Sequence, residues 1–408
     1  MNPAGREETE GAPPTDARFW LMLLRPALNR IREGALELHL PDGRVISAGS
    51  GEPSARIEIR RWRALRRMAF GGELGLARAF LDGDWDTPDL MGFFQTALAN
   101  MQQLKPSAHG SLPSRLAGLF HHRRRANTRQ GSRRNIAAHY DLGNDFYAEW
   151  LDPSMTYSSG FFEGGANSLE SAQQAKYRRI CDAAGIRPGD RVLEIGCGWG
   201  GFAEVAAREY GASIEGVTLS TEQLAYARER AERGGFADRA KFHLTDYRDT
   251  DGHYDHVVSI EMFEAVGEEN WPVYFSTVRD RLKPGGSAML QSITIRDRDF
   301  ESYRRRQDFI QRYIFPGGML PSPERFWSAA KDAGLVPGGE SFFGQSYATT
   351  LMEWHRRFNA AWERIAAMPG FDARFRRMWN FYLLYCAAGF SADAINVGQF
   401  RLVRPDQT

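Results

Sequence analysis

Three glycines lie close together between an apolar run and a helix-like run in the sequence VLEIGCGWGGFAEVAARE: Gly196, Gly198 and Gly200. A glycine at a strand-to-helix turn lets the backbone approach a ligand closely, and the N-terminus of the following helix then faces that ligand. Together with Gly201, the spacing of Gly196 and Gly198 also fits the GxGxxG pattern of dinucleotide sites. The glycine loop therefore indicates a nucleotide-containing cofactor, and both NAD and S-adenosylmethionine (SAM) are candidates.

The residues around this loop favour SAM over NAD. Glu194 lies two positions before the first glycine, where a carboxylate can hold the charged amino group of an amino-acid ligand. The second strand-like run ends in Thr218, where a dinucleotide site needs an acid that binds the ribose. Asp246 and Tyr247 close the third run, where a carboxylate can accept from the adenine amine and a ring can stack on the base. We therefore expect SAM.

Strand-like and helix-like runs alternate around the glycine loop. The apolar pattern predicts helices and strands in the order helix 168–185, strand 192–195, helix 202–211, strand 212–220, helix 221–235, strand 241–246, strand 254–262, helix 271–282, turn 283–286 and strand 287–295. This alternation predicts an α/β fold with a doubly wound, mostly parallel sheet and helices on both faces. Because ligands of such sheets bind at the carboxyl ends of the strands, the glycine loop and the acids at the strand ends should meet there.

The length of 408 residues exceeds that of one ordinary domain, which has about 100–200 residues. Short alternating runs mixed with helical runs after residue 17 predict a small α+β domain ahead of the glycine loop. A stretch rich in Pro, Ser, Gly and Arg then marks the best boundary. We expect a disordered tail over residues 1–16, an N-terminal domain over 17–104, a basic linker over 105–134 and the main α/β domain over 135–408.

Composition excludes several classes of protein. The formal net charge of +1 argues against a nucleic-acid binder, because such domains usually carry a large basic excess. No apolar run reaches the ~20 residues that span a bilayer, and the N-terminus lacks the apolar core of a signal peptide, so we expect a cytoplasmic protein. The three cysteines are scattered and predict neither disulfides nor a metal site. The segment HHRRRANTRQGSRRN, with six arginines and no acid, indicates either a solvated linker or a patch attracted to anionic lipid headgroups.

A collinear series of motifs carries a family resemblance. The segments AHYDLGNDFYAEWLDPSMTYSSGFFE, VLEIGCGWGG, GVTLSTEQ, SIEMFEAVG, LKPGG, YIFPGGMLPS, SYATTLMEWHRRF and NVGQFRLVR follow one another from His139 to Arg404. This series resembles the cyclopropane-fatty-acyl-phospholipid synthase family, which includes the mycolic acid cyclopropane synthases. The run LARAFLDGDWD is similar to the N-terminal domain of the phospholipid-acting members, which implies that the domain over 17–104 is lipid-associated. The resemblance implies a SAM-dependent methyltransferase with a helical cap over an acyl tunnel.

The resemblance also implies roles for residues around the cofactor. Tyr157 and Ser158 are expected to cover it, and the glycines of the loop to approach its methionine part. Thr218 and Gln223 are expected to hold the ribose, which explains why an acid is missing there. Asp246 and Tyr247 should flank the adenine, as their place in the sequence already indicates. The expected cofactor-binding residues are Tyr157, Ser158, Glu194, Gly196, Gly198, Gly200, Thr218, Gln223, Asp246 and Tyr247.

The implied reaction is the methylation of a carbon–carbon double bond. An isolated alkene is a weak nucleophile with no proton to remove first, so catalysis must come from placing it in a dry pocket and stabilising the carbocation that follows. Aromatic faces and a carboxylate suit such a cation. The candidates are Glu264, Tyr347, Phe263, Tyr313 and Phe315. The chemistry requires neither a metal nor a covalent nucleophile.

Cyclopropane-forming members of the family are thought to hold a bicarbonate ion as the base, and the chain departs from that site. It keeps the matching Glu264, Ile293 and Tyr347, but has Ser159 in place of a cysteine and Gln291 in place of a histidine. Ser and Gln can still hydrogen-bond an anion, although Gln cannot carry a positive charge. Two nearby residues stay open. His139 either acts in catalysis or fixes the loop that covers the cofactor, and Glu261 is either a solvated acid or a member of the site.

These substitutions leave two products open, a cyclopropane and a methyl-branched acyl chain that keeps a double bond. The expected substrate is an unsaturated acyl chain of a phospholipid at the inner face of the membrane. Two alternative functions are those of a catalytically silent SAM- or lipid-binding homologue and of a methyltransferase acting on a small soluble molecule. Members of the family often form homodimers, but the sequence indicates no interface, acyl chain length, double-bond position or headgroup preference.

Overall fold

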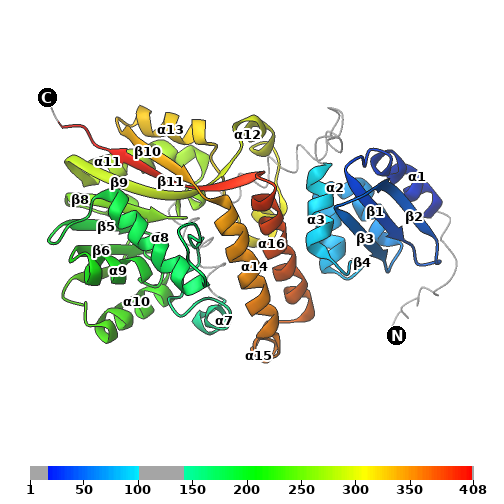
Figure 1. Ribbon diagram of the computed structural model, residues 1–408, viewed down its shortest axis with the longest axis horizontal. Helices are drawn as coiled ribbons and strands as arrows, with labels where there is room; N and C mark the ends of the chain where they lie inside the picture. Colours follow the sequence, from blue (N-terminus) through cyan, green and yellow to red (C-terminus); the bar gives the residue numbers. More distant parts are fainter. Residues whose placement is uncertain (1–16, 101–141, 407–408) are drawn as a thin grey trace, which may run out of the picture. The chain divides into compact units, whose positions relative to one another are not determined.

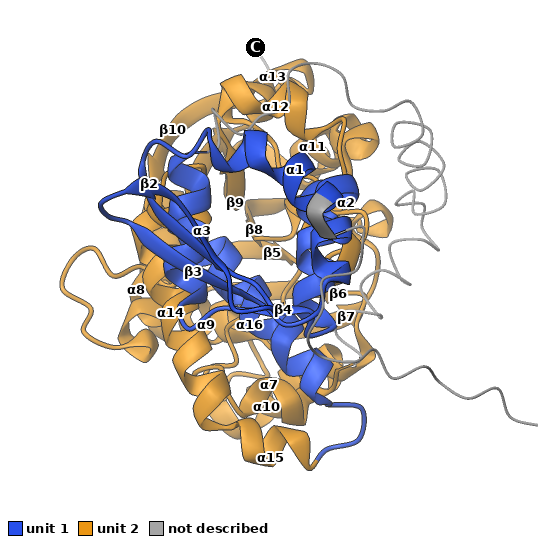
Figure 2. Cartoon of the chain, turned by 90° about the vertical axis from the view of Figure 1, so that its right-hand side faces the viewer, with its two compact units in different colours: residues 1–110, 368–388 blue, residues 111–367, 389–408 orange. Residues whose placement is uncertain are grey.

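The computed structural model describes residues 17–100 and 142–406, so His139 and the arginine-rich segment lie outside the described residues. The chain forms two compact units (Figure 2). Unit 1 contains residues 1–110 and 368–388, and unit 2 contains residues 111–367 and 389–408. No helix in the described ranges is long and apolar enough to cross a membrane.

Unit 1 combines a small sheet with helices. Its elements are α1 (Ala17–Leu28), β1 (Gly34–His39), β2 (Val45–Ser50), β3 (Ser54–Ile59), α2 (Arg63–Leu81), β4 (Trp85–Asp86), α3 (Leu90–Ala99) and most of α16 (Ala373–Ser391). The strands are ordered β2-β1-β3-β4, with β1 and β3 parallel and the outer pairs antiparallel. The lipid-associated role expected for residues 17–104 stays a prediction.

The helix α16 supplies unit 1 with contacts that the sequence did not predict. Arg377 donates to the carbonyl oxygen of Phe80 at 2.6 Å and to Oδ2 of Asp86 at 3.1 Å. The ring of Phe381 packs against Phe80 and Phe94, with centroids 5.4 and 4.8 Å apart. Residues 368–388 therefore group with the N-terminal unit, whereas the sequence predicts one domain over 135–408, because an apolar helical stripe does not indicate its partner.

Unit 2 is built on a seven-stranded sheet (Figure 1). Its strands are β5 (Arg191–Ile195), β6 (Ser213–Thr218), β7 (Ala240–Leu244), β8 (Tyr254–Ile260), β9 (Leu282–Ile295), β10 (Val336–Phe342) and β11 (Ile395–Val403), in the order β10-β11-β9-β8-β5-β6-β7. The strands from β9 to β7 are parallel, and β11 is antiparallel to both of its neighbours. The predicted mostly parallel sheet is confirmed.

Helices cover both faces of this sheet. The helices of unit 2 include α7 (Asn144–Ala148), α8 (Leu169–Ala184), α9 (Gly201–Glu209), α10 (Thr221–Gly234), α11 (Trp271–Arg281), α12 (Asp297–Tyr303), α13 (Pro323–Asp332), α14 (Gly344–Ala360) and α15 (Trp362–Ala366). Apolar side chains of α8, α9 and α10 form one buried cluster, and those of α11 and α13 form another. Ser168 begins α8 with a capping box, and Gly185 ends it in a left-handed conformation, as the run 168–185 predicts.

The order in which strands are added to the sheet reverses at β5, and this reversal creates a place for a ligand. From β5 the chain adds β6 and β7 on one side, and then β8 and β9 on the other. Ligands of doubly wound sheets bind at such a switch point, outside the carboxyl ends of the strands.

One local prediction was wrong: residues 283–286 form a bulge within β9, because Leu282 still pairs with Tyr254 and Ser287 with His256.

Candidate active site

The glycine loop joins the end of β5 to α9. Gly196, Gly198 and Gly200 have φ angles of +84°, +51° and +83°, a region that residues with side chains rarely adopt. A Cβ atom on Gly196 would come within 2.9 Å of the Met262 side chain, whereas one on Gly198 would enter open space. The loop thus leaves backbone uncovered at the switch point, where a cofactor can approach it.

Glu194 supplies a buried carboxylate directly beneath this loop. Its side chain is 3% exposed, and Oε2 has no hydrogen-bond partner among the residues that the structure describes. Burial raises the pKa of Glu194 well above its usual range, although the positive charges of Arg230 and Lys176 act in the opposite direction. A cationic amino group at Oε2 would satisfy this oxygen and favour the ionised form. The site therefore fits the amino-acid part of SAM.

Thr218 and Gln223 meet at the end of β6. The hydroxyl of Thr218 donates to Oε1 of Gln223 at 2.9 Å, and both side chains are buried. Ser220 caps α10 by accepting from the backbone N–H of Gln223 at 3.3 Å. The cap fixes the first turn of the helix, so the hydroxyl and the amide are held in place for a ribose.

Asp246 and Tyr247 follow β7. The carboxylate of Asp246 accepts from Nε of Arg248 at 2.8 Å and from Nη2 at 2.6 Å, and the guanidinium lies 5.5 Å from the ring centroid of Tyr247. The sequence did not predict this ion pair. An adenine-binding role for Asp246 and Tyr247 stays a prediction, and any such ligand would share the Asp246 carboxylate with Arg248.

Tyr157 lies in a cluster of aromatic rings. Its ring centroid is between 5.3 and 6.4 Å from those of Tyr147, Trp150, Phe315 and Trp354. The rings come from α7, from the loop that follows α7, from the segment before α13 and from α14. The quadrupole of an aromatic face attracts positive charge, so this cluster suits a cationic ligand or intermediate.

Lys176 is a buried cation that the sequence prediction missed. Its Nζ donates to Oγ of Ser158 at 2.6 Å and to Oε1 of Gln173 at 2.7 Å, and the side chain is fully buried. Burial lowers the pKa of Lys176 to about 7, while the charges of Glu261, Asp152 and Glu194 oppose that shift. Lys176 thus positions Ser158, one of the residues expected to cover the cofactor.

Glu261 directly follows β8 and is held by hydrogen bonds from other segments. Its Oε1 accepts from the backbone N–H of Ser159 at 2.9 Å and from Nε2 of Gln291 at 2.8 Å, and its Oε2 accepts from the hydroxyl of Tyr347 at 2.6 Å. The φ angle of Glu261 is +51°. The three donors come from three separate segments, so the structure rules out the alternative of a solvated acid.

Glu264 forms the second half of a carboxylate pair. Its Oε1 accepts from the backbone N–H of Ile293 at 2.5 Å and from Oγ of Ser292 at 3.1 Å, while its buried Oε2 has no hydrogen-bond partner among the described residues. Burial, and then the charge of Glu261, raise the pKa of Glu264 to about 8. Two buried carboxyl groups thus lie close enough for the charge of one to raise the pKa of the other.

The other candidates lie in different surroundings. Phe263 is 1% exposed and packs in the core against Trp271, Tyr274, Phe275 and Phe326. The ring of Tyr313 packs against Phe309, with centroids 5.3 Å apart. Phe315 joins the aromatic cluster, as noted above. The catalytic roles of these residues, and that of His139 outside the described ranges, stay predictions.

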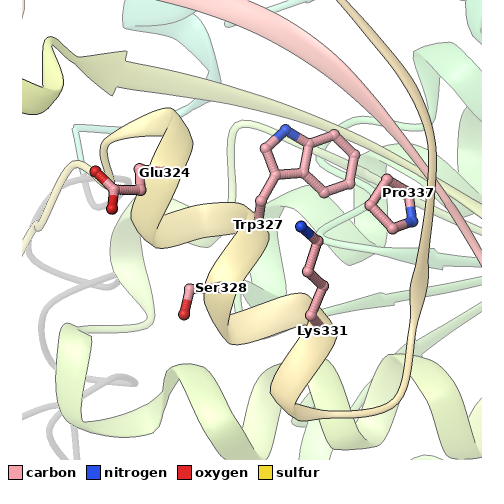
Figure 3. A pocket seen from close by; sticks show the side chains of 5 residues that line it. All are labelled: Glu324, Trp327, Ser328, Lys331 and Pro337. Atoms are coloured by element: carbon pink, nitrogen blue, oxygen red, sulfur yellow. The ribbon is translucent and has the colours of Figure 1, made fainter.

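A surface hollow of about 500 Å³ lies elsewhere on unit 2 (Figure 3). It is lined by Glu324, Trp327, Ser328, Lys331 and Pro337, of which the first four belong to α13. None of the residues expected to bind a cofactor or act in catalysis lines it. The switch point of the sheet, and not this hollow, carries the candidate chemistry.

The fold and the site define the class of protein. A doubly wound sheet, whose first strand leads through a buried carboxylate into a glycine loop, is the arrangement of a SAM-dependent methyltransferase. The structure matches that of the mycolic acid cyclopropane synthase CmaA1 complexed with SAH and CTAB, with a TM-score of 0.62 and 29% identity, over 66% of this chain and 98% of the other. The cyclopropane synthase MmaA2 from Mycobacterium tuberculosis matches equally well.

Residues 127–400 match the family model of mycolic acid cyclopropane synthetase, and the chain belongs to this family. It is 38% identical to a tuberculostearic acid methyltransferase of Mycobacterium tuberculosis, over 90% of this chain and 88% of that protein. It is also 38% identical to the cyclopropane-fatty-acyl-phospholipid synthase of Escherichia coli K12, over 86% and 88% of the two chains. The predicted family, fold class, cofactor and enzyme class are confirmed.

Proposed function

We propose that this enzyme methylates the double bond of an unsaturated fatty acyl chain in a phospholipid, and that the product is a cyclopropane or a methyl-branched, still unsaturated chain. The observation that carries the proposal is that the segment expected to cover the cofactor contacts the carboxylate pair, although the two lie far apart in the sequence. Ser158 is bonded to Lys176, and the next residue, Ser159, donates its backbone N–H to Glu261. Groups that suit SAM and groups that suit a carbocation thus meet within two residues.

Different side chains of the site would bind the cofactor and stabilise the cation. When bound, SAM supplies an electrophilic methyl group. Glu194, Thr218 and Gln223 would hold its amino-acid and ribose parts. The aromatic cluster around Tyr157 would exclude water and face the positive charge on the acyl chain, and the carboxylate pair would stabilise that charge at closer range.

Relatives support the choice of substrate. The Escherichia coli relative is named for fatty-acyl phospholipids, and the Mycobacterium tuberculosis relative for tuberculostearic acid. Both share 38% identity with this chain over most of its length. A methyltransferase of a small soluble molecule would not need the apolar side chains that are exposed on α1 and α2.

We also propose that the enzyme works at an anionic membrane surface, with unit 1 making contact. Apolar side chains are exposed on α1 and α2 of this unit, among them Phe19, Met22, Leu23 and Phe70, which is 72% exposed. The ring of Trp20 packs between Phe19 and Phe70 at 4.9 and 5.0 Å. Clustered apolar side chains on a surface mark protein or membrane contacts, and the sequence from residue 17 to 81 also contains several arginines.

The test uses purified protein, methyl-labelled SAM and phospholipid vesicles. Mass spectrometry of the released acyl chains should show one added labelled carbon with monounsaturated vesicles and none with saturated vesicles. Labelling of neither kind of chain would contradict the proposed function and favour a silent homologue. Size-exclusion chromatography with light scattering would separately test the homodimer that the family resemblance implies.

A further inference from the structure

We propose that the carboxylate of Glu261 is the base that removes the proton from the carbocation, in the place where cyclopropane-forming relatives are thought to use a free bicarbonate ion. This inference rests on the proposed function, because it concerns the second half of the same reaction. It assigns a catalytic role to a residue that the family resemblance did not include.

The contacts of Glu261 are those of a bound anion. Three donors converge on its carboxylate: the backbone N–H of Ser159, the amide of Gln291 and the hydroxyl of Tyr347. Gln291 is itself oriented, since its Oε1 accepts from Nε2 of Gln399 at 3.0 Å. The donors come from a loop, from β9 and from α14, so only the folded unit brings them together. They form an anion site, and a side chain of the same chain fills it.

The family resemblance named five positions for the bicarbonate ion, and the two glutamates engage all five. Ser159, Gln291 and Tyr347 bind Glu261, whereas Glu264 itself is one of the five and accepts from the backbone N–H of Ile293. An additional anion would lack these donors and would lie beside two carboxyl groups. Neighbouring like charges disfavour one another, so a further anion would be bound poorly here.

The backbone of Glu261 agrees with this assignment. Its φ of +51° lies in the left-handed region, which residues with a side chain rarely adopt. A residue stays in this region when its surroundings over-determine it, and such residues gather at functional sites. Here the conformation turns the side chain toward Ser159, Gln291 and Tyr347.

Electrostatics divide the two carboxyl groups into an acid and a base. Burial raises the pKa of Glu261, whereas its three donors and the positive charge of Lys176 act in the opposite direction. Glu264 accepts from Ile293 and Ser292, and its pKa is raised to about 8. More donors therefore stabilise the charged form of Glu261 than that of Glu264, and we assign Glu261 as the member that accepts a proton.

The step balances without a further reagent. After methylation, the acyl chain carries a positive charge on one of the two former alkene carbons. Glu261 takes a proton either from the added methyl group or from a chain carbon next to the cation. The electron pair of the broken C–H bond closes the cyclopropane in the first case and forms a new double bond in the second. Glu261 then loses its proton to water.

The test compares the wild type with Glu261→Gly and Glu261→Gln in buffer freed of carbon dioxide. Gly suits the positive φ and empties the anion site, whereas Gln fills the same space without a charge. The wild type should keep its rate within twofold when bicarbonate is added. Both variants should lose about a hundredfold or more, since a positioned general base contributes roughly 10²–10⁴ in rate. Added bicarbonate should restore turnover in the Gly variant and not in the Gln variant.

Calorimetry provides a readout other than activity. SAH should bind all three proteins alike, which checks that the variants are folded. Bicarbonate should bind the SAH-loaded Gly variant but neither the wild type nor the Gln variant. A wild type that is active but loses its rate without bicarbonate would overturn the inference, as would a Gly variant that neither binds bicarbonate nor regains turnover. A wild type inactive under all conditions would instead overturn the proposed function.

Discussion

The hydroxyl of Tyr347 donates a 2.6 Å hydrogen bond to Oε2 of Glu261, across 86 residues of sequence. Tyr347 is buried on α14, and its ring packs against Phe390 with centroids 4.4 Å apart. The bond ties the helix α14 to the end of β8. It also makes Tyr347 a positioning residue for the carboxylate to which we assign proton removal.

Replacing Tyr347 with Phe removes this one donor and keeps the ring. We expect turnover to fall about tenfold or more, because a hydrogen bond to a charged group contributes roughly 1.5–3 kcal/mol. Affinity for SAH should stay within twofold. Steady-state kinetics and calorimetry measure the two quantities, and an unchanged rate would show that Glu261 does not need the phenol.

Glu194→Gln tests the cofactor site. The variant keeps the shape of the side chain but removes the charge that should hold the amino group of SAM. The affinity for SAH should fall about tenfold or more, while the melting temperature of the ligand-free protein should stay equal or rise, because an unsatisfied buried carboxylate is gone. Equal SAH affinity in calorimetry would show that Glu194 does not contact the amino group.

The carboxylate pair predicts a pH dependence of stability. Because the pKa of Glu264 is raised to about 8 in the folded state, its protonated form favours folding. This contribution is complete below about pH 4.5, its unfolded pKa, and is lost as the pH rises through 8. Lys176, with its pKa lowered to about 7, has the opposite effect on stability, because its neutral form favours folding. Glu261 and Glu194 lie in the same region, and burial raises the pKa of both.

The Glu264→Gln variant isolates that contribution. Thermal unfolding between pH 6 and 9 should show a gain in melting temperature, relative to the wild type, that grows with pH. The neighbouring groups are present in both proteins, so they largely cancel in the comparison. A difference that is constant across this range would contradict the raised pKa.

Membrane contact by unit 1 predicts an effect of two exposed residues. The double variant Met22→Ser and Phe70→Ser should reduce sedimentation with anionic vesicles several-fold, since each side chain would bury apolar area in the lipid. Val273→Ser is the matched control, because Val273 is also exposed but belongs to unit 2. Equal loss in the control, or no loss in the double variant, would place the contact elsewhere.

The sequence predicted the parallel sheet, the capped helix α8 and the glycine loop, because each depends on neighbouring residues with a regular spacing. It did not settle the place of Glu261. The three donors to this carboxylate lie 102, 30 and 86 residues away along the chain, and spacing alone does not reveal such contacts.

Lys176 was missed even though the sequence carries a signal for it. Ala172, Lys176 and Ile180 follow one another at intervals of four, and all three are buried in α8. A lysine on the apolar face of a helix therefore could have been flagged as a buried cation. The place of α16 had no comparable signal, because its many aromatic residues could pack against either unit.

The most direct measurement is nuclear magnetic resonance of the lipid product formed by the wild type from 13C-methyl SAM and a monounsaturated phospholipid. We predict that the labelled carbon is bonded to a former alkene carbon, either as a cyclopropane methylene or as a methyl branch beside a retained double bond. A label on the headgroup, or on any atom other than the former alkene carbons, would contradict it.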